Sequence, residues 1–221
     1  SWWALPKFLP HTAEHHAEAK AARERHGSAW LEPRTLLIGV VVLAAAFTEG
    51  TANDWLAVAF VEGHDLPAWA GVLAFATFLT AMTIGRLVGT RLLDRHGRVP
   101  VLRVSFALAA LGAAMVIFGS AWLAFIGAAV WGVGAALGFP VGMSASADDA
   151  TRAAARMSVV ATIGYVAFIA GPPLLGLLGD SVGVLRSLLL VGALAILALS
   201  VVPAVREPAG GTGDRAPAAS A

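Results

Sequence analysis

Three side chains that could do chemistry, Glu49, Asn53 and Asp54, interrupt the apolar stretch AAAFTEGTANDWLAVAF at residues 44–60. A carboxylate near the centre of a membrane-spanning helix costs about 2.5–3.5 kcal/mol, and such side chains usually mark the path of a substrate or a proton. Helical spacing places Glu49 and Asn53 on one face. We therefore expect Glu49 to handle a substrate or a proton. The alternative is that this end of the helix is partly aqueous and its acids are simply solvated.

The elements that hold these residues are long apolar blocks. Of the 221 residues, 58% are hydrophobic and 13% are charged, against about 25% charged in soluble domains. A helix of about 20 apolar residues spans a bilayer. The blocks are 35–61, 66–89, 99–118, 122–145, 156–178 and 184–203. We predict an all-α membrane protein with one six-helix bundle at 35–203, after a cytoplasmic segment at 1–34 and before a disordered tail at 204–221.

Composition excludes several classes of function. The formal net charge of +1 gives no electrostatic support for nucleic-acid binding, and the absence of cysteine excludes disulfides and thiolate metal sites. His11 and His15, near Glu14 and Glu18, could hold a metal on a helix, but a solvated connector explains them as well. The sequence has neither the HExxH pattern of zinc proteases nor a phosphate-binding loop, so we expect no metal, no cofactor and no use of ATP.

The basic residues predict how the bundle is oriented. Cytoplasmic loops hold an excess of Lys and Arg. Thirteen of the fifteen basic residues lie on one side of the predicted spans; Arg186 lies on the other side and Arg86 lies within a span. Both termini should therefore be cytoplasmic.

The loop after the second span carries a motif of glycine and charged residues. Its residues are Gly89, Asp94, Arg95, Gly97 and Arg98. Asp94 could accept hydrogen bonds from the N-terminal amides of a neighbouring helix, where negative charge is favoured. Gly97 would permit a sharp reversal of the chain. Asp180 repeats the theme three spans later, which predicts two three-helix units in an inverted repeat, as in secondary transporters.

Glycine and proline mark two spans for close packing and bending. The fourth span carries the stripe Gly134, Gly138 and Gly142, with Pro140 inside it, which permits tight packing and a bend. The fifth span should break or kink at a motif made of Gly171, Pro172, Pro173 and Gly176.

With DRHGR after the second span, its weak repeat, and EGTANDW followed by ATIGYVAFIAGPPLLG, the sequence resembles the major facilitator superfamily (MFS). It looks like the second six-helix half of such a transporter, in a bacterial inner-membrane branch, with residues 1–34 as the end of the preceding helix and the central cytoplasmic loop. In the family's loop motif a glycine stands four residues before the aspartate; here Thr90 takes that place and Gly89 precedes it. The resemblance implies that the first and fourth spans line a central cavity, which adds Trp131 to Glu49, Asn53 and Asp54. Its implied partners are the bilayer, a missing N-terminal six-helix half, a small-molecule substrate and protons.

The predicted function is therefore secondary active transport by alternating access with proton coupling, in a chain that is a fragment and not an enzyme. One alternative is an intramembrane serine protease, for which Gly142-Met143-Ser144 would supply the nucleophile. Such an enzyme needs a base near the serine, and the candidates His64 and His96 lie at span ends. The other alternative is a membrane scaffold or sensor that transports nothing, which the embedded acids argue against.

Overall fold

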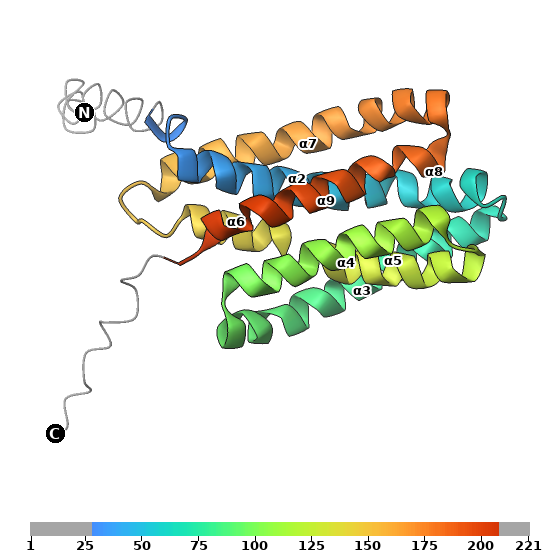
Figure 1. Ribbon diagram of the computed structural model, residues 1–221, viewed down its shortest axis with the longest axis horizontal. Helices are drawn as coiled ribbons and strands as arrows, with labels where there is room; N and C mark the ends of the chain where they lie inside the picture. The colour runs from blue at the N-terminus through green and yellow to red at the C-terminus, as the bar shows by residue number, and fades with distance from the viewer. Residues whose placement is uncertain (1–27, 208–221) are drawn as a thin grey trace, which may run out of the picture.

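The computed structural model describes residues 28–207, and every regular element in this range is helical (Figure 1). The longer helices are α2 (Pro33–Val58), α3 (Ala68–His96), α4 (Arg98–Phe118), α5 (Ala121–Ala135), α6 (Gly138–Ser146), α7 (Ala153–Val182) and α9 (Leu189–Val201). Shorter pieces complete the spans: a π-helix η2 (Ala59–Gly63), α8 (Val184–Ser187) and a 3-10 helix η3 (Val202–Val205).

These elements form six segments that are long and apolar enough to cross a membrane. They are Pro33–Gly63, Ala68–His96, Arg98–Phe118, Ala121–Ser146, Ala153–Val182 and Val184–Val205. Each segment coincides with one of the apolar blocks, so the prediction of an all-α, six-span bundle is confirmed.

The helix contacts follow an inverted repeat of three spans. α2 packs along α7, the fifth span, and α3 packs along α5, which begins the fourth span. Exchanging the first three spans with the last three converts one of these pairs into the other. α4 and α9, the third spans of the two units, pack on each other.

Two matching turns support the same repeat. Gly97 follows the second span with φ 77° and ψ 172°, and Gly183 follows the fifth with φ 90° and ψ 153°. Both N–H groups donate to the carbonyl four residues earlier, at 2.8 Å. Positive φ favours glycine, so the predicted reversal at Gly97 is confirmed.

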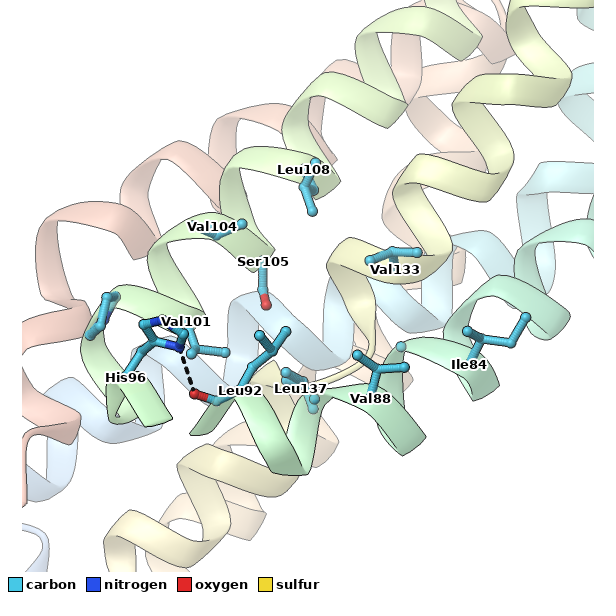
Figure 2. A pocket seen from close by; sticks show the side chains of 13 residues that line it. Ile84, Val88, Leu92, His96, Val101, Val104, Ser105, Leu108, Val133 and Leu137 are labelled. Atoms are coloured by element: carbon cyan, nitrogen blue, oxygen red, sulfur yellow. Dashed lines mark hydrogen bonds between the residues drawn. The ribbon is translucent and has the colours of Figure 1, made fainter. Parts of the chain in front are cut away.

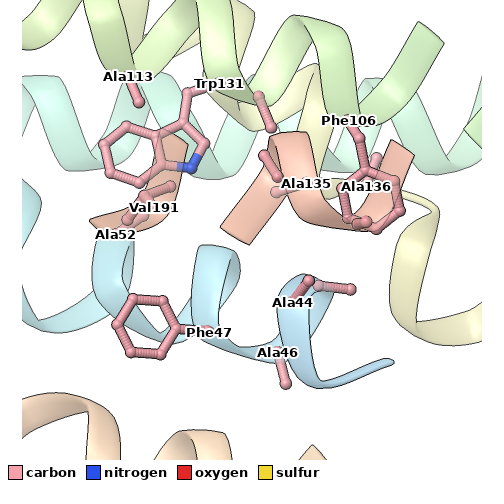
Figure 3. Packing of buried hydrophobic residues seen from close by; sticks show 14 of the residues in the cluster. Ala44, Ala46, Phe47, Ala52, Phe106, Ala113, Trp131, Ala135, Ala136 and Val191 are labelled. Carbon is pink, nitrogen blue, oxygen red and sulfur yellow. The ribbon is translucent and has the colours of Figure 1, made fainter. Parts of the chain in front are cut away.

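Small residues let the helices approach closely around a core that centres on the fully buried Trp131. Figure 3 shows its indole between Ala113 of α4, Ala52 of α2 and Val191 of α9, and Phe78 of α3 meets it edge-to-face, with ring centroids 6.1 Å apart. This close packing matters because apolar lipid provides no hydrophobic driving force for helix association, so van der Waals contacts must hold the helices together.

The glycine stripe of the fourth span confirms the predicted close packing. A Cβ at Gly134 would lie 2.7 Å from the Cα of Ala109 on α4. A Cβ at Gly138 would lie 2.6 Å from the Cβ of Ala45 on α2. The stripe therefore meets α4 first and α2 after the span has bent.

The bend in the fourth span lies between α5 and α6, at Ala136 and Leu137. Pro140 follows in the first turn of α6, where a missing backbone N–H is tolerated. The fifth span was predicted to break or kink, and it does not break, because α7 continues through Pro172 and Pro173. Gly171 and Gly176 instead lie over Phe47 and Trp55 of α2. Neighbouring helices commonly support prolines within membrane helices.

Candidate transport site

An ion pair joins Glu49 of α2 to Arg86 of α3. One guanidinium nitrogen, Nη2, lies 3.1 Å from Oε1 and 3.0 Å from Oε2 of the carboxylate. Glu49 is at the middle of the first span, 16 residues after Pro33 and 14 before Gly63. Arg86 lies 18 residues into the second span, which begins at Ala68. Each charge at this depth therefore balances the other.

Arg86 also ties α3 to the bend of the fourth span. Its Nε donates to the carbonyl of Ala136, at 3.2 Å. In an unbroken helix that carbonyl would accept from the N–H of residue 140, which is proline and has none. Gly85 makes the approach possible, since a Cβ there would lie 2.9 Å from the Cβ of Ala136. Arg86 thus satisfies a carbonyl that Pro140 leaves free.

The exposure of the two charges differs. The side chain of Arg86 is 44% exposed and that of Glu49 is 18% exposed. Arg86 borders a polar cavity of about 960 Å³, whose other polar side chains are Thr90, Asp94, Arg98, Ser144 and Glu207. Asn53 and Asp54, further along α2, are exposed. A polar solute that enters the cavity would meet Arg86 before it meets Glu49.

A network of ion pairs closes one end of the bundle, which we call the basic end and which carries Arg34, Arg98, Arg152, Arg156 and Arg206. Asp148, in the loop between α6 and α7, pairs with Arg34 and with Arg98, at 2.7 Å each. Arg34 also donates to the carbonyls of Ala204 and Arg206. Asp148 therefore holds the start of α2 and the turn after α3 against the fourth span.

Glu32 forms a second centre in the basic end. Its carboxylate pairs with Arg152 and, at 2.7 Å, with Arg156, and it accepts a hydrogen bond from Thr35. Burial acts to raise the pKa of Glu32, but the hydrogen bonds from Arg156 and Thr35 and the charges of Arg156 and Arg152 outweigh it, so this pKa lies below its usual value. The entry of α2 is thereby tied to the start of α7.

Asp149 adds a weaker tie at the basic end. It lies 3.4 Å from Arg156, and hydrogen bonds from the hydroxyl and backbone N–H of Thr151 lower its pKa. Asp148, Asp149 and Glu32 were not predicted as site residues, because their partners lie on other spans.

Sequence comparison places the chain in a family. The model of the Major Facilitator Superfamily matches residues 42–220. The chain belongs to the major facilitator superfamily. An uncharacterized transporter of Sinorhizobium fredii is 31% identical over 77% of this chain and 46% of its own length. An uncharacterized MFS-type transporter of Yersinia pestis is 32% identical over 81% of this chain and 47% of its own length.

A third relative has a name that refers to a function. The class H tetracycline resistance protein of Pasteurella multocida is 36% identical over 55% of this chain and 30% of its own length. The chain thus spans about half the length, or less, of these superfamily relatives.

The predicted site residues of this MFS chain do not all lie together. Glu49, Asn53 and Asp54 lie along α2, but Trp131 is buried in the core and its Nε1 has no hydrogen-bond partner within residues 28–207. Arg86 was not predicted to be the partner of Glu49. The one signal available was that Arg86 is a basic residue inside an apolar span.

The loop motif differs from the prediction in its use of charge. Asp94 is exposed, borders the polar cavity and makes no hydrogen bond or ion pair within the described part of the chain. The expected bond from Asp94 to helix-terminal amides is therefore absent from this range. Arg98 carries the tie instead, through Asp148 and, at 3.3 Å, the hydroxyl of Ser144. Gly89 lies against Leu137 at the bend, and Arg95 is exposed.

Nothing in the described range supports the protease alternative. The hydroxyl of Ser144 accepts from Arg98, which is a cation and no base. His64 lies against the carbonyl of Val116 at 2.8 Å, and His96 against the carbonyl of Leu92 at 3.2 Å. His11 and His15 lie outside the described residues.

A second cavity, of about 430 Å³, lies between α3, α4 and α5 (Figure 2). Its lining is almost entirely apolar, and His96 and Ser105 are the polar side chains in it. None of the described residues that line it carries a carboxylate or a guanidinium. The polar cavity beside Arg86 is therefore the better candidate for binding a polar solute.

Proposed function

We propose that the protein is a secondary active transporter that moves a small solute by alternating access and couples this movement to protons. The observation that carries the proposal is the ion pair between Glu49, at the middle of its span, and Arg86 beside a polar cavity. Charged groups inside the membrane are costly and usually serve transport. The transporter names of the relatives from Sinorhizobium fredii and Yersinia pestis agree with this function.

We further propose that this chain works with a second six-helix half in the bacterial inner membrane. The length of the relatives supports this proposal, because the chain spans 46% of one and 47% of another. α3 and α7 offer the second half largely apolar surfaces, where Leu87 and Leu177 are each 72% exposed. The excess of arginine at the basic end supports a cytoplasmic location for that end.

Within this transporter, Glu49 takes up and releases the coupling proton. Glu49→Gln keeps the size and hydrogen-bonding capacity of the side chain but removes its ability to lose a proton. Asp54→Asn should have a milder effect, because Asp54 is more exposed.

The experiment reconstitutes the full-length protein in liposomes that contain a pH-sensitive dye, adds a panel of small solutes, and measures proton movement together with solute counterflow. Wild type should move protons with a transported solute. Glu49→Gln should lose this movement while counterflow survives. Glu62→Gln is the matched control, since Glu62 is an exposed acid in η2 at the end of the same span. Wild-type proton movement in Glu49→Gln would show that the acid is structural.

A further inference from the structure

Arg86 keeps hydrogen-bond donors that nothing in the described range uses. A guanidinium carries five N–H donors. In Arg86, Nε donates to Ala136 and Nη2 faces both oxygens of Glu49, whereas Nη1 has no partner within residues 28–207. The side chain is 44% exposed and borders the polar cavity. Its free edge is therefore accessible to a solute.

The other charges of the polar cavity are arranged differently. The side chain of Arg98 is 17% exposed and pairs with Asp148 at 2.7 Å. A carboxylate oxygen of Glu207 also lies 3.6 Å from Nε of Arg98. Asp94 is the remaining ionisable group of the lining, and its negative charge repels an anion. Arg86 therefore offers the more accessible cationic surface in this cavity.

Few other ionisable groups face the pair from the helices packed around it. On α2, Asp54 lies beyond Glu49 toward the far end of the span. α5 and α9 contain no charged residue, and between Arg156 and Asp180 the only titratable residue of α7 is Tyr165, which is exposed. Protonation near Arg86 thus falls on Glu49 and, at the mouth of the cavity, on Asp94 and Glu207.

We propose that Arg86 is an anion receptor controlled by Glu49, and that the solute carries a carboxylate or phosphate group. This proposal rests on the proposed transport function and names its substrate class. A planar guanidinium binds such groups through paired, charge-assisted hydrogen bonds. The Ala136 carbonyl holds the side chain in place, and Glu49 competes with the solute for Nη2.

Proton uptake changes this competition. A proton that enters the cavity binds a carboxylate oxygen of Glu49 and removes its negative charge. Arg86 then keeps its positive charge without a counterion, and the anionic group of the solute takes the place of the Glu49 carboxylate. The site gains one proton and one anion together, so its net charge is unchanged. The same coupling predicts that the anion and the proton bind cooperatively.

The test measures anion binding at equilibrium, without transport. The full-length protein in detergent is titrated with acetate and with inorganic phosphate, and the midpoint of thermal unfolding is followed. Three forms are compared at pH 7: wild type, Glu49→Gln, and the double variant Glu49→Gln with Arg86→Gln. Acetamide, which is neutral, and methylammonium, which is a cation, serve as matched probes.

We expect Glu49→Gln to bind acetate and phosphate roughly tenfold more tightly than wild type, because a charge-assisted competitor is gone. The double variant should lose this gain, and acetamide should have no effect. Equal anion dependence in Glu49→Gln and the double variant would overturn the proposal. Preferential stabilisation of wild type by methylammonium would also overturn it and would assign Glu49 as a cation site.

A second measurement decides the matter if Glu49→Gln does not fold. Wild type should bind acetate more tightly at pH 5 than at pH 7, and a variant that lacks both cavity-mouth acids, Asp94→Asn with Glu207→Gln, should keep that pH dependence. A pH-independent affinity would refute control by Glu49. If anion binding behaves as expected but Glu49→Gln still couples solute to protons in liposomes, the receptor stands and proton coupling through Glu49 fails.

Discussion

Arg86→Gln should destabilise the bundle more than Glu49→Gln does. The substitution removes a charge, leaves Glu49 unpaired in the middle of its span, and weakens the bond to Ala136. Removing one partner costs about 3–5 kcal/mol in a fully buried pair, whereas an exposed pair is worth about 0.2–1 kcal/mol. With side-chain exposures of 44% for Arg86 and 18% for Glu49, the structure places this pair between those limits. We expect a loss of about 2 kcal/mol, in the middle of that range.

The double variant should be more stable than Arg86→Gln alone by about 1 kcal/mol, because the unpaired carboxylate is gone. Glu49→Gln alone should cost least, since the freed guanidinium reaches the cavity and stays solvated. The assay is reversible unfolding of the purified full-length protein in mixed micelles, followed by tryptophan fluorescence. A double variant no more stable than Arg86→Gln, or a greater loss in Glu49→Gln, would refute the reasoning.

The remaining predictions concern packing, pH and orientation. Gly134→Ala should destabilise by about 1–3 kcal/mol through a clash with rigid backbone. Gly192→Ala should be neutral or stabilising in the same unfolding assay, because a Cβ there would meet no atom of residues 28–207 within 4 Å. Because the pKa of Glu32 is lowered, its contribution to stability is complete above its usual pKa of 4.5 and is lost as pH falls through the lowered value. The difference in unfolding free energy between wild type and Glu32→Gln should therefore shrink below pH 4.5, and a constant difference would contradict this. A reporter fused after Arg215 should read cytoplasmic and one inserted at 62–66 external, and reversed signals would refute the orientation.

The spans were predictable from sequence because the bilayer sets the length of an apolar helix. The turn at Gly97 was predictable because few residues other than glycine adopt positive φ. The bend before Pro140 was predictable for a related reason, the missing N–H. Each of these features depends on a short stretch of chain and on one physical constraint.

The partner of Glu49 was not predictable, because it depends on how two helices rotate against each other. Arg86 lies on another span, and its direction is fixed by Gly85 and by a free carbonyl at the bend. A break at Pro172, one of the two outcomes predicted there, does not occur for a similar reason, since α2 packs along α7. The helix-breaking tendency of a proline does not reveal whether a neighbouring helix packs against it and stabilises the helix.

The paired glycine turns also bear on how the bundle enters the membrane. Gly97 and Gly183 give opposite ends of the bundle nearly the same backbone turn. Arg95 and Arg98 lie beside Gly97, whereas Ser181 lies beside Gly183 and the nearest basic residue there, Arg186, comes three residues later. Because the inverted repeat has nearly the same shape in both orientations, shape alone does not determine which way the bundle is inserted into the membrane. We therefore expect the arginines to set the orientation. Moving the exposed Arg95 to the turn at Gly183 should weaken that preference and leave the packing intact, whereas moving Arg98 would also remove its ion pair with Asp148.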